Sequence, residues 1–232
     1  MLISYSQKFL FVHIAKTGGT SVRAALRRYR WGGWYSLVML MASQVDQITR
    51  PRHKLALKFP RHAKAVAAKE ILPEPVFDSL FKFVTVRNPF DLQVSSYHHI
   101  LREKPEVLEG VRNFGDFLRL KFDPERQYNY MLDISAELQH EYILDLQGRI
   151  IVDFIARYES LQEDFQTACG RIGIPTPRLP HLRKAQDRDD YRRYYTDELA
   201  ELVAGHYNRD LEVLGYSFDG SPEGTEESEP SP

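Results

Sequence analysis

The chain has 232 residues, of which 43% are hydrophobic and 27% are charged. This composition is typical of a globular domain and excludes disordered, collagen-like and disulfide-stapled proteins, and no apolar run reaches the ~18–20 residues that a membrane helix needs. The 31 basic and 32 acidic residues leave a net charge of -1, which argues against a nucleic-acid-binding protein. The lone cysteine, Cys169, and the lack of a secretion signal predict a cytoplasmic protein.

Short apolar strand patterns and amphipathic helix patterns alternate along the chain. Strands are expected at residues 8–14, 54–59, 80–86 and 150–155. Helices are expected at residues 20–30, 63–72, 89–102, 113–122, in two short pieces within 128–146, after Ser160, and across 191–214 with a break near Thr196. This alternation favours an α/β fold of three layers, with a mostly parallel central sheet flanked by helices.

A glycine-containing loop, Ile14-Ala15-Lys16-Thr17-Gly18-Gly19-Thr20-Ser21, separates the first predicted strand from the first predicted helix. Successive backbone N–H groups in such a loop form a cradle for an anion, to which a lysine adds charge and hydroxyl groups add donors. The arrangement is P-loop-like, but a Walker lysine follows its glycines and this lysine precedes them. A tight turn with an incidental lysine is the alternative. The candidate anion-binding residues are Lys16, Thr17, Gly18, Gly19, Thr20 and Ser21.

A second candidate anion site follows the predicted strand at residues 80–86. The strand leads into Arg87, and a helix that begins at Pro89 carries Ser95 two turns later. Ligands of open α/β sheets bind at the carboxyl ends of the strands, so Arg87 is expected at the same edge as the Lys16 loop. A magnesium-dependent NTPase would need a carboxylate at such a strand end, and none is well placed. Two anion sites favour a doubly phosphorylated nucleotide that is bound without a metal ion.

Residues 11–21 resemble the 5′-phosphosulfate loop of the carbohydrate sulfotransferases, and residues 82–97 resemble their 3′-phosphate element. Later segments, at residues 151–161, 179–184 and 194–216, also resemble this family. The resemblance implies a sulfotransferase that uses 3′-phosphoadenosine 5′-phosphosulfate (PAPS), releases 3′-phosphoadenosine 5′-phosphate (PAP) and sulfates a hydroxyl, with a sugar or glycan as the expected acceptor.

The same resemblance assigns individual residues. It implies that Arg87 and Ser95 bind the 3′-phosphate and that Lys184 makes a late contact with the donor. The sequence departs from the family pattern at Ala15, where proline is usual, and at Leu92, where arginine is frequent. Two further departures flank Lys184: Arg183 and Ala185 replace a frequent Asn and Ser.

Sulfuryl transfer needs a base for the acceptor hydroxyl and a positive charge for the departing phosphate. Lys16 suits the second role. His62 is the candidate base, because it follows the predicted strand 54–59, precedes a predicted helix and resembles a His-Ala element of the family. A structural or substrate-binding role for His62 is the alternative, with His181 and His13 as the next candidate bases.

Charge is unevenly distributed along the chain. Residues 50–69 hold seven basic residues and no acid, a pattern that attracts anions and fits an anionic acceptor, or else forms a solvated basic face. Residues 219–232 hold five acids and no base, which predicts a disordered acidic tail after a sulfotransferase domain at 1–218. Two other functions stay open: a P-loop nucleotide kinase or NTPase, and a non-catalytic nucleotide-binding relative.

Overall fold

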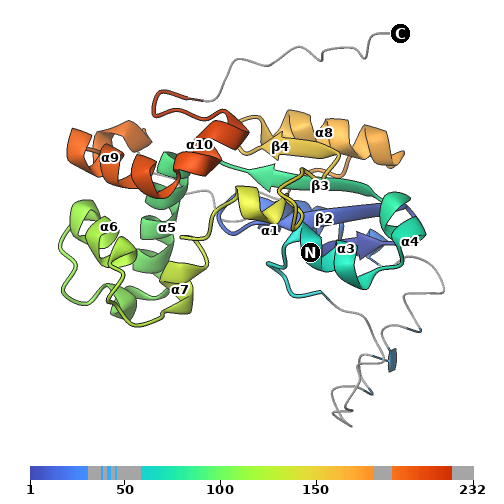
Figure 1. Ribbon diagram of the computed structural model, residues 1–232, viewed down its shortest axis with the longest axis horizontal. Coiled ribbons are helices and arrows are strands. Elements are labelled where there is room, and N and C mark those ends of the chain that lie inside the picture. Colours follow the sequence, from blue (N-terminus) through green and yellow to red (C-terminus); the bar gives the residue numbers. More distant parts are fainter. Residues whose placement is uncertain (31–37, 39–40, 43–44, 46–58, 180–189, 221–232) are drawn as a thin grey trace. The chain divides into compact units, whose positions relative to one another are not determined.

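The computed structural model describes residues 1–30, 38, 41–42, 45, 59–179 and 190–220 (Figure 1). The chain divides into two compact units. The first unit contains Met1–Arg87 and Glu141–Lys184, and the second contains Asn88–His140 and Ala185–Pro232. Most of the predicted strand at 54–59 and nearly all of the predicted acidic tail lie outside the described residues.

The first unit is built on a four-stranded sheet in the order β1-β2-β3-β4. Its strands are β1 (Leu2–Ser4), β2 (Phe9–His13), β3 (Phe81–Val86) and β4 (Phe154–Arg157). β3 pairs in parallel with β2 and with β4, whereas β1 pairs with β2 in antiparallel fashion. The sheet is therefore mixed, and the prediction of a mostly parallel sheet is wrong.

The antiparallel strand β1 was not predicted, because three residues are too few to show the two-residue alternation of apolar and polar side chains. Only residues 5–8 separate β1 from β2, and so short a connection joins antiparallel neighbours, since a parallel pair needs a long crossover. Lys8 helps to close this turn with a positive φ of 50°.

Strand β4 also begins later than the predicted strand at 150–155. The chain before it forms a turn around Asp145, whose side chain accepts hydrogen bonds from the backbone N–H groups of Gln147 and Arg149 at 2.9 Å each. Leu144 and Ile150 pair across this turn as an isolated antiparallel bridge. Ile150 thus belongs to the turn, and pairing with β3 starts only at Phe154.

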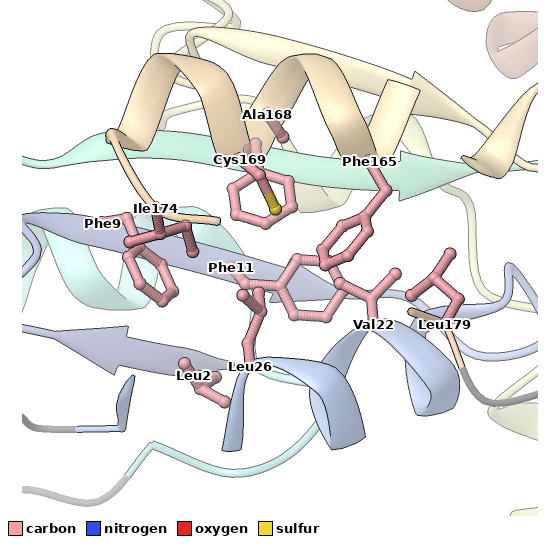
Figure 2. Close-up of a cluster of buried hydrophobic side chains, with 11 residues drawn as sticks. Leu2, Phe9, Phe11, Val22, Leu26, Phe165, Ala168, Cys169, Ile174 and Leu179 are labelled. Carbon is pink, nitrogen blue, oxygen red and sulfur yellow. The ribbon is translucent and has the colours of Figure 1, made fainter. Parts of the chain in front are cut away.

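One face of the sheet forms the core of the first unit. Phe9, Phe11 and Phe83 point to this face, and the rings of Phe11 and Phe83 lie 4.9 Å apart. Helices α1 (Gly19–Ala25) and α8 (Leu161–Ile172) pack against them, as Figure 2 shows. Cys169 of α8 is fully buried in this cluster, where burial raises the pKa of its thiol to about 11, so it packs rather than reacts.

Helices cover the opposite face as well. The ammonium group of Lys82, which alternates with Phe81 and Phe83 along β3, lies 5.1 Å from the ring centroid of Phe77 in α4 (Glu74–Asp78). Other helical elements of this unit are η1 (Arg27–Tyr29), α3 (Ala65–Ile71) and η3 (His140–Tyr142), the last of which straddles the unit boundary. A sheet flanked by helices confirms the α/β class.

The second unit is helical in its described part. Its elements are α5 (Pro89–Glu103), η2 (Pro105–Leu108), α6 (Phe114–Phe122), α7 (Tyr130–Asp133), η4 (Tyr191–Tyr194), α9 (Asp197–His206) and α10 (Asn208–Leu214). Side-chain caps start five of them, and the three that begin longer helices are Asn88, which accepts from the N–H of Phe90, Asn113, which accepts from that of Asp116, and Thr196, which accepts from that of Leu199. The Thr196 cap explains the predicted break. None of the described helices is long and apolar enough to cross a membrane.

Candidate active site

The loop between β2 and α1 turns sharply at the residues expected to bind an anion. Lys16 and Gly18 both have positive φ angles, of 66° and 80°. A lysine is uncommon in this left-handed region because its Cβ is crowded there, so the surrounding structure must hold it. Loops with such residues can turn successive N–H groups to one side and bind anions. The backbone conformation therefore fits the predicted cradle.

Two side chains hold this loop to strand β3. The guanidinium of Arg87 donates from Nη1 to the Lys16 carbonyl oxygen at 3.0 Å. The Thr17 hydroxyl donates to the Ile14 carbonyl oxygen at 3.0 Å and lies 2.9 Å from the Thr85 hydroxyl. Thr17 is fully buried and its hydroxyl secures the loop, and its predicted contact with an anion stays a prediction.

Besides the Lys16 ammonium group, the loop offers its backbone N–H groups and the two hydroxyls at the start of α1 as donors. Thr20 is partly exposed, and Ser21 is 9% exposed. Gly18 forms the N-cap position of the helix, where no side chain caps it. Helix α1 continues only to Ala25, shorter than the predicted helix at 20–30, and a 3-10 turn follows it.

Each glycine of the loop lies against another side chain. A Cβ placed on Gly18 would lie 2.7 Å from Leu161 Cδ2 and 3.0 Å from Tyr158 Cδ2. A Cβ on Gly19 would lie 2.2 Å from Cδ2 and 2.7 Å from Nε2 of the His13 imidazole. These contacts leave no room for any larger residue and bring the backbone of the loop directly onto the side chains beneath it.

Gly19→Ala is expected to destabilise the fold. The His13 ring is 3% exposed and packs against Phe11 and His62, so it can yield only at the expense of the core. Overpacking of this kind costs about 1–3 kcal/mol, which urea unfolding would show as a lower midpoint. Gly170→Ala is the matched control, because a Cβ on this glycine of α8 has nothing within 4 Å. Equal midpoints for Gly19→Ala and the parent would contradict this prediction.

Arg87 lies at the edge of the sheet where the Lys16 loop begins, as predicted. Its side chain is almost fully buried, with its guanidinium carbon 3.8 Å from the ring centroid of Tyr158. Tyr158 follows β4, and its backbone N–H donates to the Val86 carbonyl oxygen at 2.8 Å. Neither Tyr158 nor Thr85 was predicted as a site residue. Their position at the carboxyl ends of strands is the signal that could have found them.

His62 and His13 form a pair of imidazoles in the first unit. His62 lies in the turn before α3, and its Nδ1 is 2.9 Å from the His13 carbonyl oxygen. The two ring centroids are 4.7 Å apart. Since a carbonyl oxygen only accepts, Nδ1 of His62 carries a proton, and in the neutral ring Nε2 keeps its lone pair. The hydrogen bond therefore orients His62 with a basic nitrogen at the far side of the ring.

Burial keeps both imidazoles neutral. It lowers the pKa of His13 to about 2, with a further contribution from His62. The pKa of His62 also falls, chiefly through burial, although its hydrogen bond to the His13 carbonyl acts in the opposite direction. Electrostatic interactions with the Met1 amino group, Arg61 and Arg23 lower the His62 pKa further. His13 is thus a packed core residue, and His62 is held in the neutral form that a base requires.

Other predicted site residues are placed differently. Ser95 lies within the first two turns of α5 and belongs to the second unit, so its part in a phosphate site stays a prediction. Lys184 and His181 lie outside the described residues. Within the part of the chain that the structure describes, no group of three or more His, Cys, Asp or Glu residues is arranged to hold a metal ion.

Comparison with known proteins adds independent evidence. An uncharacterized protein of Archaeoglobus fulgidus is 28% identical over 118 residues, which are 51% of this chain and 88% of that protein. No solved structure matched the chain significantly. A family described as "Sulfotransferase family" matches residues 1–217, the span that holds the Lys16 loop, Arg87 and His62. The chain therefore belongs to the sulfotransferase family, whose members are transferases that move a sulfuryl group to an acceptor.

Proposed function

We propose that this protein transfers the sulfuryl group of PAPS to a hydroxyl of a sugar or glycan. One observation carries the proposal. Lys16 and Arg87 follow the adjacent parallel strands β2 and β3, and the Arg87 guanidinium donates a hydrogen bond to the Lys16 carbonyl oxygen. Two cationic groups beside a glycine loop fit a nucleotide with phosphates at both its 5′ and 3′ positions. The strand, loop and helix at residues 9–25 would then act as a P-loop-like donor site.

The fit to this donor also rests on the shape of the loop. Gly18 and Gly19 have no Cβ, and any Cβ there would collide with Tyr158 or His13, so the backbone is held close to the sheet edge. Lys16 supplies a point charge for the 5′-phosphate, and the Arg87 fork supplies paired donors for the 3′-phosphate. Ser95 and Lys184 are proposed as further donor contacts on the sequence evidence alone.

PAPS supplies an activated sulfuryl group whose sulfur is bonded to the 5′-phosphate. Nε2 of His62 takes the proton from the acceptor hydroxyl, whose oxygen then forms a bond to sulfur as the sulfur–phosphate oxygen bond breaks. Lys16 stabilises the negative charge that develops on the departing phosphate. The products are the sulfate ester of the acceptor, PAP and one proton, which leaves His62 when the site is regenerated.

The acceptor is proposed to be anionic as well as hydroxylated. Arg61 and Arg23 are close enough to His62 to lower its pKa. A carboxylate or an existing sulfate on a sugar would be drawn to these charges, so that a neighbouring hydroxyl is presented to the base.

Turnover of PAPS against a panel of acceptors tests the function. PAP release is expected with sulfated or carboxylated saccharides, more slowly with their neutral counterparts, and with equal rates in excess EDTA. Hydrolysis of ATP that requires magnesium would instead indicate a nucleotide kinase or NTPase. Binding of PAP by calorimetry without turnover of any acceptor would indicate a non-catalytic relative.

A further inference from the structure

Tyr158 contacts both halves of the candidate donor site. The face of its ring lies against the guanidinium of Arg87, at 3.8 Å from the ring centroid. Its edge lies against Gly18, since a Cβ there would be 3.0 Å and 3.3 Å from two carbons of the ring. Its backbone N–H bonds to the residue before Arg87. The ring is therefore wedged between the glycine loop and the cation.

The arginine needs such support. An unrestrained arginine side chain samples many rotamers and loses that freedom when it binds a phosphate. Here the Tyr158 ring holds the plane of the guanidinium, and the hydrogen bond from Nη1 to the Lys16 carbonyl oxygen holds its rotation in that plane. Arg87 is only 4% exposed, so both contacts act with little competition from water.

We infer that Tyr158 is a positioning residue, whose ring holds Arg87 in the orientation that binds the 3′-phosphate of the donor. The inference rests on the proposed function, because it assigns Arg87 to that phosphate. In this inference the face of the Tyr158 ring holds the Arg87 guanidinium, and the phenol hydroxyl is not required for that contact.

Comparison of two nucleotides separates this role from others. Adenosine 5′-phosphate (AMP) lacks the 3′-phosphate that PAP carries, so the ratio of their dissociation constants reports the Arg87 contact. Tyr158→Leu keeps an apolar side chain against Gly18 but removes the ring face. Calorimetry is expected to show PAP binding weakened by about fivefold to tenfold and AMP binding nearly unchanged in Tyr158→Leu, and parental PAP binding in Tyr158→Phe.

A double variant provides the decisive check. If Tyr158 acts through Arg87, Tyr158→Leu combined with Arg87→Ala binds PAP no more weakly than Arg87→Ala alone. Phe154→Leu is the matched control, because it removes another arginine–aromatic contact, that of Arg171 with Phe154, from the start of β4. It should leave both nucleotide affinities unchanged.

Three results would overturn the inference. Equal losses for PAP and AMP in Tyr158→Leu would show that the ring contacts the nucleotide directly or only supports the loop. Additive losses in the double variant would show that Tyr158 and Arg87 act independently. If the parent protein does not bind PAP at all, both the proposed donor and this inference are rejected. The titration of the parent with PAP therefore separates a failure of the proposed function from a failure of the inference about Tyr158.

Discussion

His62→Ala is expected to lower kcat by at least about 10²-fold and to leave PAP affinity nearly unchanged. The proposed base is oriented by the hydrogen bond between its Nδ1 and the His13 carbonyl oxygen, which leaves Nε2 to take the acceptor proton. Alanine removes that nitrogen but none of the groups assigned to the donor phosphates. Steady-state kinetics with PAPS and a responsive acceptor, alongside PAP calorimetry, measures both effects.

His62→Asn is the matched control for structure. An asparagine amide can donate to the His13 carbonyl oxygen as the imidazole does, but it cannot act as a base. We therefore expect the Asn and Ala variants to be equally slow, with the Asn variant the more stable of the two. Parental turnover in either variant would show that another residue is the base, and His181 and then His13 would be tested next.

The pH dependence of kcat/KM should also report the protonation of His62. Since burial lowers the pKa of His62 below the ordinary value of 6.5, its neutral form persists to more acidic pH than in a free histidine. The kcat/KM of the parent should therefore fall only as the pH drops below about 6.5. This acidic limb should be absent in His62→Ala, which has no imidazole to protonate at that position. An unchanged limb would assign it to another group.

Lys16→Ala and Arg87→Ala are each expected to weaken PAP binding at least tenfold. Hydrogen bonds to charged groups contribute about 1.5–3 kcal/mol, and ~1.4 kcal/mol corresponds to tenfold in affinity. The loss should be larger for Arg87→Ala, because Arg87 also holds the Lys16 carbonyl and so maintains the strained backbone of the loop. Isothermal calorimetry measures the affinities, and urea unfolding checks that both variants fold.

Two variants sharpen this experiment. Arg87→Lys keeps the charge but loses the planar fork, so it should bind PAP more weakly than the parent and more tightly than Arg87→Ala. Arg171→Ala removes an arginine from α8 whose guanidinium lies over Phe154, away from the loop, and should have no effect. Parental affinity in both Lys16→Ala and Arg87→Ala would reject the two-phosphate donor site.

Local patterns in the sequence were sufficient to locate the strands and the loop that form the proposed donor site. Strands β2 and β3 lie where the apolar runs predicted them, and Lys16 and Arg87 follow those strands. The prediction succeeded because a buried strand, a glycine turn and a helix start each leave a pattern within a few residues. Parallel pairing then brings the ends of β2 and β3 to one edge, where Arg87 and the Lys16 carbonyl meet.

The contacts that complete the site were decided only by the tertiary structure. Thr17 meets Thr85 across 68 positions of sequence, and His62 meets the His13 carbonyl across 49. No local period encodes such pairs, because they depend on which strands become neighbours. The same holds for Tyr158, which reaches Arg87 only because β4 pairs with β3. The sequence by itself thus determined the α/β class and the charged groups, whereas strand pairing determined which side chains hold those groups in place.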